Sequence, residues 1–334
     1  MAFALLGNAL RDELERADGA PRRRRGTKQP ARVTVEPAPV IVHDGDGVPT
    51  GTELLSVRNL SVGYGLPDGS EKTVVEDVAL TVRRGEVHGL IGESGSGKTQ
   101  TAFSILRLLP GGGRIVAGSI TFEGTDLAVL SAKEMTALRG KKIAYIPQEP
   151  MSNLDPSFTI GSQLVEPMRI HLGLSKADAK ARALDLLAQV GIPQPERTFA
   201  AYPHEVSGGM AQRVLIAGAV SCDPELLIAD EPTTALDVTV QAEVLDLLRD
   251  LQRERQMGVL LVTHNFGVVA DLCDRVSVMQ SGRIVETGPV RSIFADPRHE
   301  YTRGLFDSVL SYTEARGPLP ASTSSGTPAE GVVA

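Results

Sequence analysis

The chain has 334 residues, of which 42% are hydrophobic, and its formal net charge at pH 7 is −7. This composition is typical of globular proteins, the length predicts about two domains, and the acidic balance argues against a nucleic-acid partner. Cys222 and Cys273 are the only cysteines and form no CxxC pair, so we expect core thiols and neither a zinc site nor a disulfide. No apolar run approaches ~18 residues and the basic start of a signal peptide is missing, which predicts a cytoplasmic protein.

The two ends of the chain differ in composition from the middle. We predict that residues 1–50 form a disordered, basic extension whose Arg22–Arg25 run is either a solvated arm or a contact for anionic lipid headgroups. Residues 308–334 form a C-terminal extension, rich in Ala, Ser, Thr, Pro and Gly from about Thr313, that should be largely disordered. One domain over residues 51–307 remains.

In that domain, strand and helix patterns alternate. Alternating or continuous apolar runs predict strands at Leu54–Val62, Val74–Val82, Val87–Ile91, Lys142–Ile146, Leu226–Ala229 and Val259–Val262. Val276–Gln280 and Arg283–Glu286 flank Ser281-Gly282 and predict a hairpin. Helical periodicity is present in Lys98–Leu109 and, within a mostly helical stretch at 160–221, in Ala177–Val190 and Met210–Val220. We therefore predict an α/β core with a helical insertion at about 155–221.

A glycine-rich loop follows the predicted strand Val87–Ile91. Gly92 to Thr99 reads G-E-S-G-S-G-K-T, which matches G-x-x-x-x-G-K-[ST] between a strand and a helix. Such glycines allow backbone N–H groups to surround phosphate oxygens at the positive end of the helix. Lys98 would contact the β- and γ-phosphates and the Thr99 hydroxyl would bind Mg²⁺. The loop predicts a nucleotide site.

Two carboxylates end the buried strand at Leu226. Asp230 would hold Mg²⁺, mostly through water, and Glu231 is the natural general base for the attacking water. Acidic residues at a strand end are common, but together with the upstream phosphate loop they predict nucleotide hydrolysis.

A third element is Ser207-Gly208-Gly209, at the start of a predicted helix. Ser207 is well placed as N-cap, and the glycines permit close approach of the backbone to an anion. In isolation this pattern would equally be an ordinary capped helix. Its position upstream of Asp230, with His264 after a further apolar strand, favours a functional role.

At this point the chain resembles the nucleotide-binding subunit of ATP-binding-cassette (ABC) transporters, over about residues 54–307. Gly92–Thr99 is similar to the Walker A motif of that family and Leu226–Glu231 to Walker B with its catalytic glutamate. Ser207–Gly209 is similar to the signature motif, although Val206 and Met210 stand where the family commonly has Leu and Gln.

Four single residues extend the resemblance. Gln148 is similar to the Q-loop glutamine, Asp237 to the D-loop aspartate and His264 to the switch histidine. Tyr64 is similar to the aromatic residue that stacks on adenine, although the segment Leu66–Lys72 after it is longer than usual.

The resemblance implies a P-loop ABC nucleotide-binding domain with a RecA-like core, an antiparallel β-subdomain and an inserted helical subdomain. It implies ATP and Mg²⁺ as cofactors, with Glu231, His264, Gln148 and Lys98 as catalytic residues. The expected metal ligands are Thr99, Gln148 and Asp230. The expected nucleotide-binding residues are Tyr64, Gly92, Glu93, Ser94, Gly95, Ser96, Gly97, Lys98, Thr99, Gln100, Ser207, Gly208, Gly209 and Asp237.

Three stretches look like the dipeptide and oligopeptide importer branch of the family: Gln148–Pro156, His204–Arg213 and Pro297–Leu305. That branch implies an ATPase subunit at the cytoplasmic face of the plasma membrane, two permease subunits and an extracytoplasmic solute-binding protein. It also implies a second, different cassette subunit, with a homodimer as the alternative. Another solute such as nickel or glutathione, or a soluble non-transport ATPase, stays open. Because no cysteine follows Cys273, we predict no iron–sulfur cluster.

Overall fold

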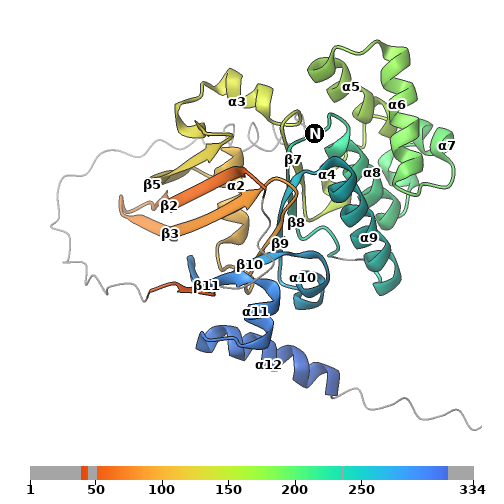
Figure 1. Cartoon of the computed structure of the whole chain (residues 1–334). Helices are drawn as coiled ribbons and strands as arrows, with labels where there is room; N and C mark the ends of the chain where they lie inside the picture. Colours follow the sequence, from red (N-terminus) through yellow and green to blue (C-terminus); the bar gives the residue numbers. More distant parts are fainter. Residues whose placement is uncertain (1–38, 44–50, 235, 315–334) are drawn as a thin grey trace, which may run out of the picture.

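The computed structural model describes residues 39–43, 51–234 and 236–314. These residues form an α/β domain with two sheets and a group of helices inserted on one side (Figure 1). The predicted fold class is confirmed: a mostly parallel core sheet, an antiparallel sheet and a helical insertion are all present. Our expectations for residues 1–38 and 315–334 fall outside the described residues.

The core sheet has seven strands in the order β1-β11-β10-β4-β9-β8-β7. All neighbours in it are parallel except the hairpin pair β10 and β11. Its strands are β1 (Ile41–Val42), β4 (Val87–Ile91), β7 (Ile143–Ile146), β8 (Leu226–Asp230), β9 (Gly258–Thr263), β10 (Arg275–Gln280) and β11 (Arg283–Pro289). Every residue of β4, β8 and β9 is buried, as expected for parallel strands that are covered on both faces.

The second sheet is antiparallel, has the order β3-β2-β5-β6 and lies at the left of Figure 1. Its strands are β2 (Glu53–Gly65), β3 (Glu71–Arg83), β5 (Gly113–Phe122) and β6 (Thr125–Asp126). Helix α2 (Lys98–Leu106) packs in the apolar cluster that the two sheets share, so the loop before α2 is held between them.

The helical insertion, at the upper right of Figure 1, packs on the other side of the core sheet. It contains α5 (Ile160–Leu172), α6 (Lys176–Gln189), α7 (Pro195–Ala200), η2 (Pro203–Glu205) and α8 (Gly208–Val220), after the short α4 (Pro150–Asn153). The remaining helices are η1 (Leu127–Val129), α3 (Ala132–Leu138), α9 (Val238–Arg255), α10 (Phe266–Leu272), α11 (Val290–Ala295) and α12 (Glu300–Glu314).

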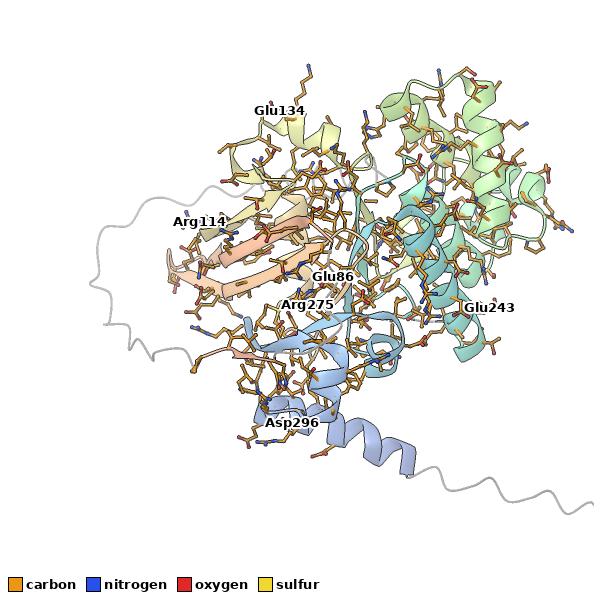
Figure 2. The ribbon with its side chains drawn as sticks, viewed as in Figure 1. Glu86, Arg114, Glu134, Glu243, Arg275 and Asp296 are labelled. Carbon is orange, nitrogen blue, oxygen red and sulfur yellow. The ribbon has the colours of Figure 1, made fainter. Side chains whose placement is uncertain are left out.

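A buried ion pair lies beside β4, at the end of the strand opposite to Gly92. Glu86, which precedes β4, lies 3.1 Å from Arg275 at the start of β10, and Figure 2 shows both near the centre of the molecule. The His88 side chain is fully buried beside Glu86, and its Nε2 lies 2.9 Å from the Ser277 hydroxyl. Burial lowers the pKa of His88 despite the neighbouring Glu86, so the ring is neutral inside the core.

Three features differ from the sequence prediction. The boundary at residue 51 was wrong in part, because β1 pairs in parallel with β11 and therefore belongs to the core sheet. The helix predicted to reach Leu109 ends at Leu106, since Arg107 adopts a left-handed conformation (φ 52°) and its guanidinium donates to the carbonyls of Leu127 and Leu130. Helix α12 crosses the boundary at residue 307.

Candidate nucleotide site

The candidate residues meet at the carboxyl ends of adjacent parallel strands. Gly92 follows β4, Asp230 ends β8 and is followed by Glu231, and His264 follows β9. Because β4 pairs with β9 and β9 pairs with β8, the three strand ends lie side by side. Ligands bind at this edge in open α/β sheets.

The loop from Gly92 to Lys98 has a backbone that only glycines adopt readily. Gly92, Gly95 and Gly97 have φ of 152°, 80° and 107°, all positive. A Cβ on Gly92 would lie 2.1 Å from the Met279 carbonyl oxygen, whereas a Cβ on Gly95 would meet no atom within 4 Å. The backbone at Gly92 is therefore packed closely against Met279, whereas the described residues leave free space around Gly95.

Two further features of the loop suit a phosphate. The hydroxyl of Ser96 is buried and has no hydrogen-bond partner in the described part of the chain. Helix α2 starts directly after Gly97 without a side-chain cap, whereas α5, α6, α8 and α9 are capped by Thr159, Ser175, Ser207 and Asp237. The first N–H groups of α2 thus have no side-chain cap, and an anionic oxygen would be a suitable acceptor for them.

The Lys98 amine is held inside the loop. Its Nζ donates to the carbonyl oxygens of Gly92 and Glu93 at 2.7 and 2.9 Å. Desolvation lowers the pKa of Lys98, and the nearby carboxylates of Glu231 and Asp230 oppose that shift. A buried cation fixed at this point attracts a polyphosphate.

Asp230 is almost completely buried. The Thr99 and Tyr145 hydroxyls lie 3.4 Å from its two carboxylate oxygens, at the long limit of a hydrogen bond. Because desolvation outweighs these weak contacts, the pKa of Asp230 is raised to about 6. The buried Asp230 carboxylate and the nearby Thr99 hydroxyl are oxygen ligands of the kind that divalent cations prefer.

Glu231 is the centre of a hydrogen-bonded cluster. The His264 Nδ1 lies 2.9 Å from its Oε1, while Thr234 Oγ1 and Gln148 Nε2 donate to Oε2 at 2.7 and 3.2 Å. Desolvation raises the pKa of Glu231, but the bonds to His264 and Thr234 outweigh it, so the pKa lies below its ordinary value. Glu231 also has a left-handed backbone (φ 47°), which is a strained conformation for glutamate. The carboxylate is thus ionised and oriented.

Tyr64 lies at the end of β2 and is half-buried. Its hydroxyl donates to Gln100 Oε1 at 2.5 Å, and its ring lies against Gly113, where a Cβ would come within 2.6 Å of the ring. The hydroxyl therefore connects the antiparallel sheet to α2, one residue after Thr99.

Ser207 and Asp237 stand apart from this cluster. Ser207 is exposed and, as predicted, caps its own helix by accepting the N–H of Met210 at 3.3 Å. Asp237 caps α9 by accepting the N–H of Val240 at 2.9 Å. Within the described residues, no hydrogen bond joins Ser207 to the loop from Gly92 to Thr99.

Helix α8, which Ser207 caps and which we call the signature helix, contacts α9. Arg213 in α8 lies 2.5 Å from Glu243 in α9, at the right of Figure 2, and a Cβ on Gly209 would lie 3.0 Å from Val240. Helix α9, which begins seven residues after Glu231, therefore lies in contact with α8.

Sequence reasoning missed three residues that contact the site: Thr234 beside Glu231, Tyr145 beside Asp230, and Tyr301, whose hydroxyl accepts the N–H of Glu93. Thr234 lies only three residues after Glu231, so a turn after the strand could have indicated it. No local pattern indicates Tyr301, which is distant in sequence.

The described residues contain neither a preformed metal cluster nor a membrane-spanning helix. No group of three or more His, Cys, Asp and Glu side chains there could hold a metal ion by itself. None of the described helices is both long and apolar enough to cross a membrane. A Mg²⁺ site is compatible with the first finding, because this ion usually binds one or two protein oxygens together with substrate phosphates.

Fold and site together define a P-loop ATPase of the cassette type, with a phosphate loop, a strand-end carboxylate pair and a helical insertion. Residues 75–234 match the family described as ABC transporter. Because a relative that is 53% identical covers 72% of its length, the chain belongs to the ABC transporter family as an ATP-binding subunit.

Three relatives illustrate this kinship. A peptide import ATP-binding protein of Brucella melitensis is 53% identical over 72% of this chain and 72% of its own length. The oligopeptide transport ATP-binding protein OppD of Bacillus subtilis is 47% identical over 83% of this chain and 77% of its own. The dipeptide transport ATP-binding protein DppD of Escherichia coli is 44% identical over 80% and 81%.

Solved structures agree with the fold. A dimeric ATP-binding cassette in a post-hydrolysis state, bound to ADP and Pi, has a TM-score of 0.65 and 27% identity over 71% of this chain and 99% of that chain. The cassette cbiO1 from Clostridium perfringens, part of the cbiONQ transporter complex, has a TM-score of 0.63 and 26% identity over 80% and 96%.

Proposed function

We propose that this chain is the ATP-hydrolysing subunit of a peptide importer and acts at the cytoplasmic face of the plasma membrane. The observation that carries the proposal is the joining of Lys98, Asp230, Glu231, His264 and Gln148 at one edge of the core sheet. The peptide substrate is supported by the names of relatives that are 44–53% identical.

In this proposal the phosphate loop binds the nucleotide. The backbone from Gly92 to Thr99 surrounds the phosphates, Ser96 supplies its unpaired hydroxyl, and Lys98 contacts the β- and γ-phosphates. The ring face of Tyr64 stacks on the adenine, while its hydroxyl bond to Gln100 joins β2 to α2.

Hydrolysis then depends on Glu231. Its ionised carboxylate accepts a proton from the attacking water, while Gln148 and Thr234 hold one carboxylate oxygen in place. His264 positions the γ-phosphate. A neutral ring that donates through Nδ1 to Glu231 has no proton on Nε2, so donation to phosphate requires an imidazolium or a change of partner.

The residues present fit a Mg²⁺ ion. Thr99, Asp230 and Gln148 supply oxygen atoms at the same edge, and Asp230 is a buried carboxylate that a cation would stabilise in its charged form. When bound by these residues, Mg²⁺ would supply positive charge that offsets the charge of the β- and γ-phosphates.

We further propose that Ser207 acts on ATP held by a second cassette subunit. Two anion-binding elements in one chain, which no hydrogen bond joins in the described part of the chain, suit a nucleotide shared between two chains. The dimeric cassette bound to ADP and Pi supports a two-cassette assembly. The second subunit is a related, different chain in this proposal. The Pro150–Pro156 loop, which Gln148 precedes, would dock on the permease subunits, and a solute-binding protein would deliver the peptide.

Reconstitution of the complex into vesicles tests the proposal. The chain is expressed with its neighbouring permeases, cassette partner and solute-binding protein, and ATP hydrolysis is measured with and without a mixture of di- to pentapeptides. We expect peptide-dependent stimulation and uptake that Glu231→Gln abolishes. Stimulation by nickel or glutathione alone would overturn the peptide assignment, and failure to co-purify with any detergent-extracted permease would overturn the transport role.

A further inference from the structure

The C-terminal helix α12 touches the phosphate loop. The backbone N–H of Glu93 donates to the Tyr301 hydroxyl oxygen at 3.1 Å, across more than two hundred residues of sequence. Tyr301 lies within the Pro297–Leu305 segment, to which neither the family motifs nor the site described above give a role. Burial raises the pKa of Tyr301, so its hydroxyl is neutral and keeps both an acceptor lone pair and a donor proton.

This hydrogen bond acts on the peptide unit that also holds Lys98. The N–H of Glu93 and the C=O of Gly92 belong to one planar peptide group. The carbonyl end accepts the Lys98 amine at 2.7 Å, and the N–H end is held by Tyr301. Rotation of this peptide would move both groups, so the Tyr301 hydroxyl restrains the orientation of the carbonyl that fixes Lys98.

The start of α12 is itself anchored firmly. The buried Glu286 carboxylate accepts the N–H groups of Arg298 and His299 at 2.8 and 3.2 Å. The same carboxylate lies 2.5 Å from the His43 ring of the segment that continues β1, and both side chains are almost fully buried. Two residues further on, the backbone N–H of Tyr301 donates to His299 Nδ1 at 3.2 Å. A series of hydrogen bonds therefore connects Tyr301 to Glu286 in β11 of the core sheet.

We propose that Tyr301 is a positioning residue for ATP binding, whose hydroxyl keeps the Gly92–Glu93 peptide in the orientation that places the Lys98 amine. The inference rests on the proposed nucleotide site. Tyr301→Phe keeps the ring but leaves the Glu93 N–H without this acceptor, so the peptide gains freedom and Lys98 is less well placed for the γ-phosphate.

A double-mutant cycle on the full-length chain tests this proposal. The affinity for the non-hydrolysable analogue AMP-PNP and for ADP is measured by calorimetry for the unchanged chain, Tyr301→Phe, Lys98→Ala and the double variant. We expect Tyr301→Phe to weaken AMP-PNP binding by about three- to tenfold, the worth of one hydrogen bond, and ADP binding by less. In the Lys98→Ala background the same change should have no further effect. Arg303→Ala, at an exposed position on the same helix, is the matched control and should change neither affinity.

The outcomes distinguish failure of the Tyr301 proposal from failure of the proposed nucleotide site. An equal loss from Tyr301→Phe in both backgrounds, or no loss in either, overturns the positioning role. If Lys98→Ala leaves nucleotide affinity unchanged, the phosphate-loop assignment itself fails. Should Lys98→Ala bind too weakly to titrate, deuterium exchange at the Glu93 amide decides the matter: Tyr301→Phe should accelerate it and Arg303→Ala should not, and unchanged exchange in Tyr301→Phe overturns the inference.

Discussion

The phosphate loop and the signature helix differ in how completely one chain supplies their partners. At the loop, Lys98 is held by backbone carbonyls, Glu231 is held by three side chains, and α12 reaches in from the far end of the sequence. At the signature motif, Ser207 and Gly208 are exposed, and within the described residues the hydrogen bonds of Ser207 are to its own helix. A region with its partners in place is preorganised, whereas a region with exposed groups suits a partner that arrives from outside.

In the proposed assembly, this difference would allow the nucleotide to act as a switch. The phosphate loop has its contacts within this chain, so in the proposed assembly ATP binding would come first. The γ-phosphate would then add contacts to the exposed end of α8 in the partner, and only such differential contacts shift a conformational equilibrium.

The largest effect is expected at the centre of the preorganised region. Glu231→Gln removes the proposed general base but keeps a side chain of similar shape, so kcat for ATP hydrolysis should fall by about 10²–10⁴-fold. ATP binding should persist and closed dimers should accumulate, as measured by size-exclusion chromatography with ATP. Normal turnover in the purified complex would show that Glu231 is not the base.

The adenine side of the loop region should respond more weakly. Tyr64→Ala should reduce nucleotide affinity by about 1–3 kcal/mol, because a stacking surface is lost. Tyr64→Phe should leave affinity nearly unchanged but lower stability by about 1 kcal/mol, since the hydroxyl bond to Gln100 disappears. Equal losses of affinity in both variants would make Tyr64 a structural residue instead.

The buried carboxylate of Asp230 predicts a pH-dependent stability. Its pKa is raised to about 6 by desolvation, so the nucleotide-free protein carries an unfavourable buried charge above pH 6, which is relieved as the pH falls toward 4. Asp230→Asn should raise the free energy of unfolding at pH 7.5 by about 1–3 kcal/mol, and this gain should fade between pH 6 and 4. Chemical denaturation at several pH values measures it, and a gain independent of pH would contradict the assignment.

The smallest effect concerns the N-terminal segment that supports the loop region. Removing residues 1–38 should leave stability unchanged, whereas removing residues 1–43 should lower it by about 1–2 kcal/mol, because Glu286 loses its buried partner His43. Urea denaturation of the two truncated chains compares them directly. If both unfold at the same urea concentration, β1 and His43 do not contribute to the core.

The sequence predicted the site residues well where a motif consists of contiguous residues. The loop from Gly92 to Thr99 and the run ending at Glu231 are contiguous, so spacing alone placed them on a strand, a turn and a helix. Strand β5 was not among the predicted strands, because only Ile120 and Phe122 are buried in it and Gly118 adopts a positive φ against the carbonyl of Asn59. Such a strand has little of the alternation by which strands are recognised.

Contacts between distant segments could not be predicted in the same way. The bonds from Tyr301 to Glu93 and from His43 to Glu286 join the ends of the domain to its centre. Each depends on how the sheet orders its strands, and no spacing within a short window encodes that order.

The claim that one catalytic site requires two chains is tested most directly by dividing two lesions between the cassettes of the purified transporter. Lys98→Ala in this chain is combined either with Ser207→Arg in the same chain or with the equivalent serine change in the partner cassette, and ATP hydrolysis is compared. If Ser207 acts in trans, both lesions of the second combination fall in one composite site, and that complex should keep activity while the first loses it. The reverse order of activities would contradict the account.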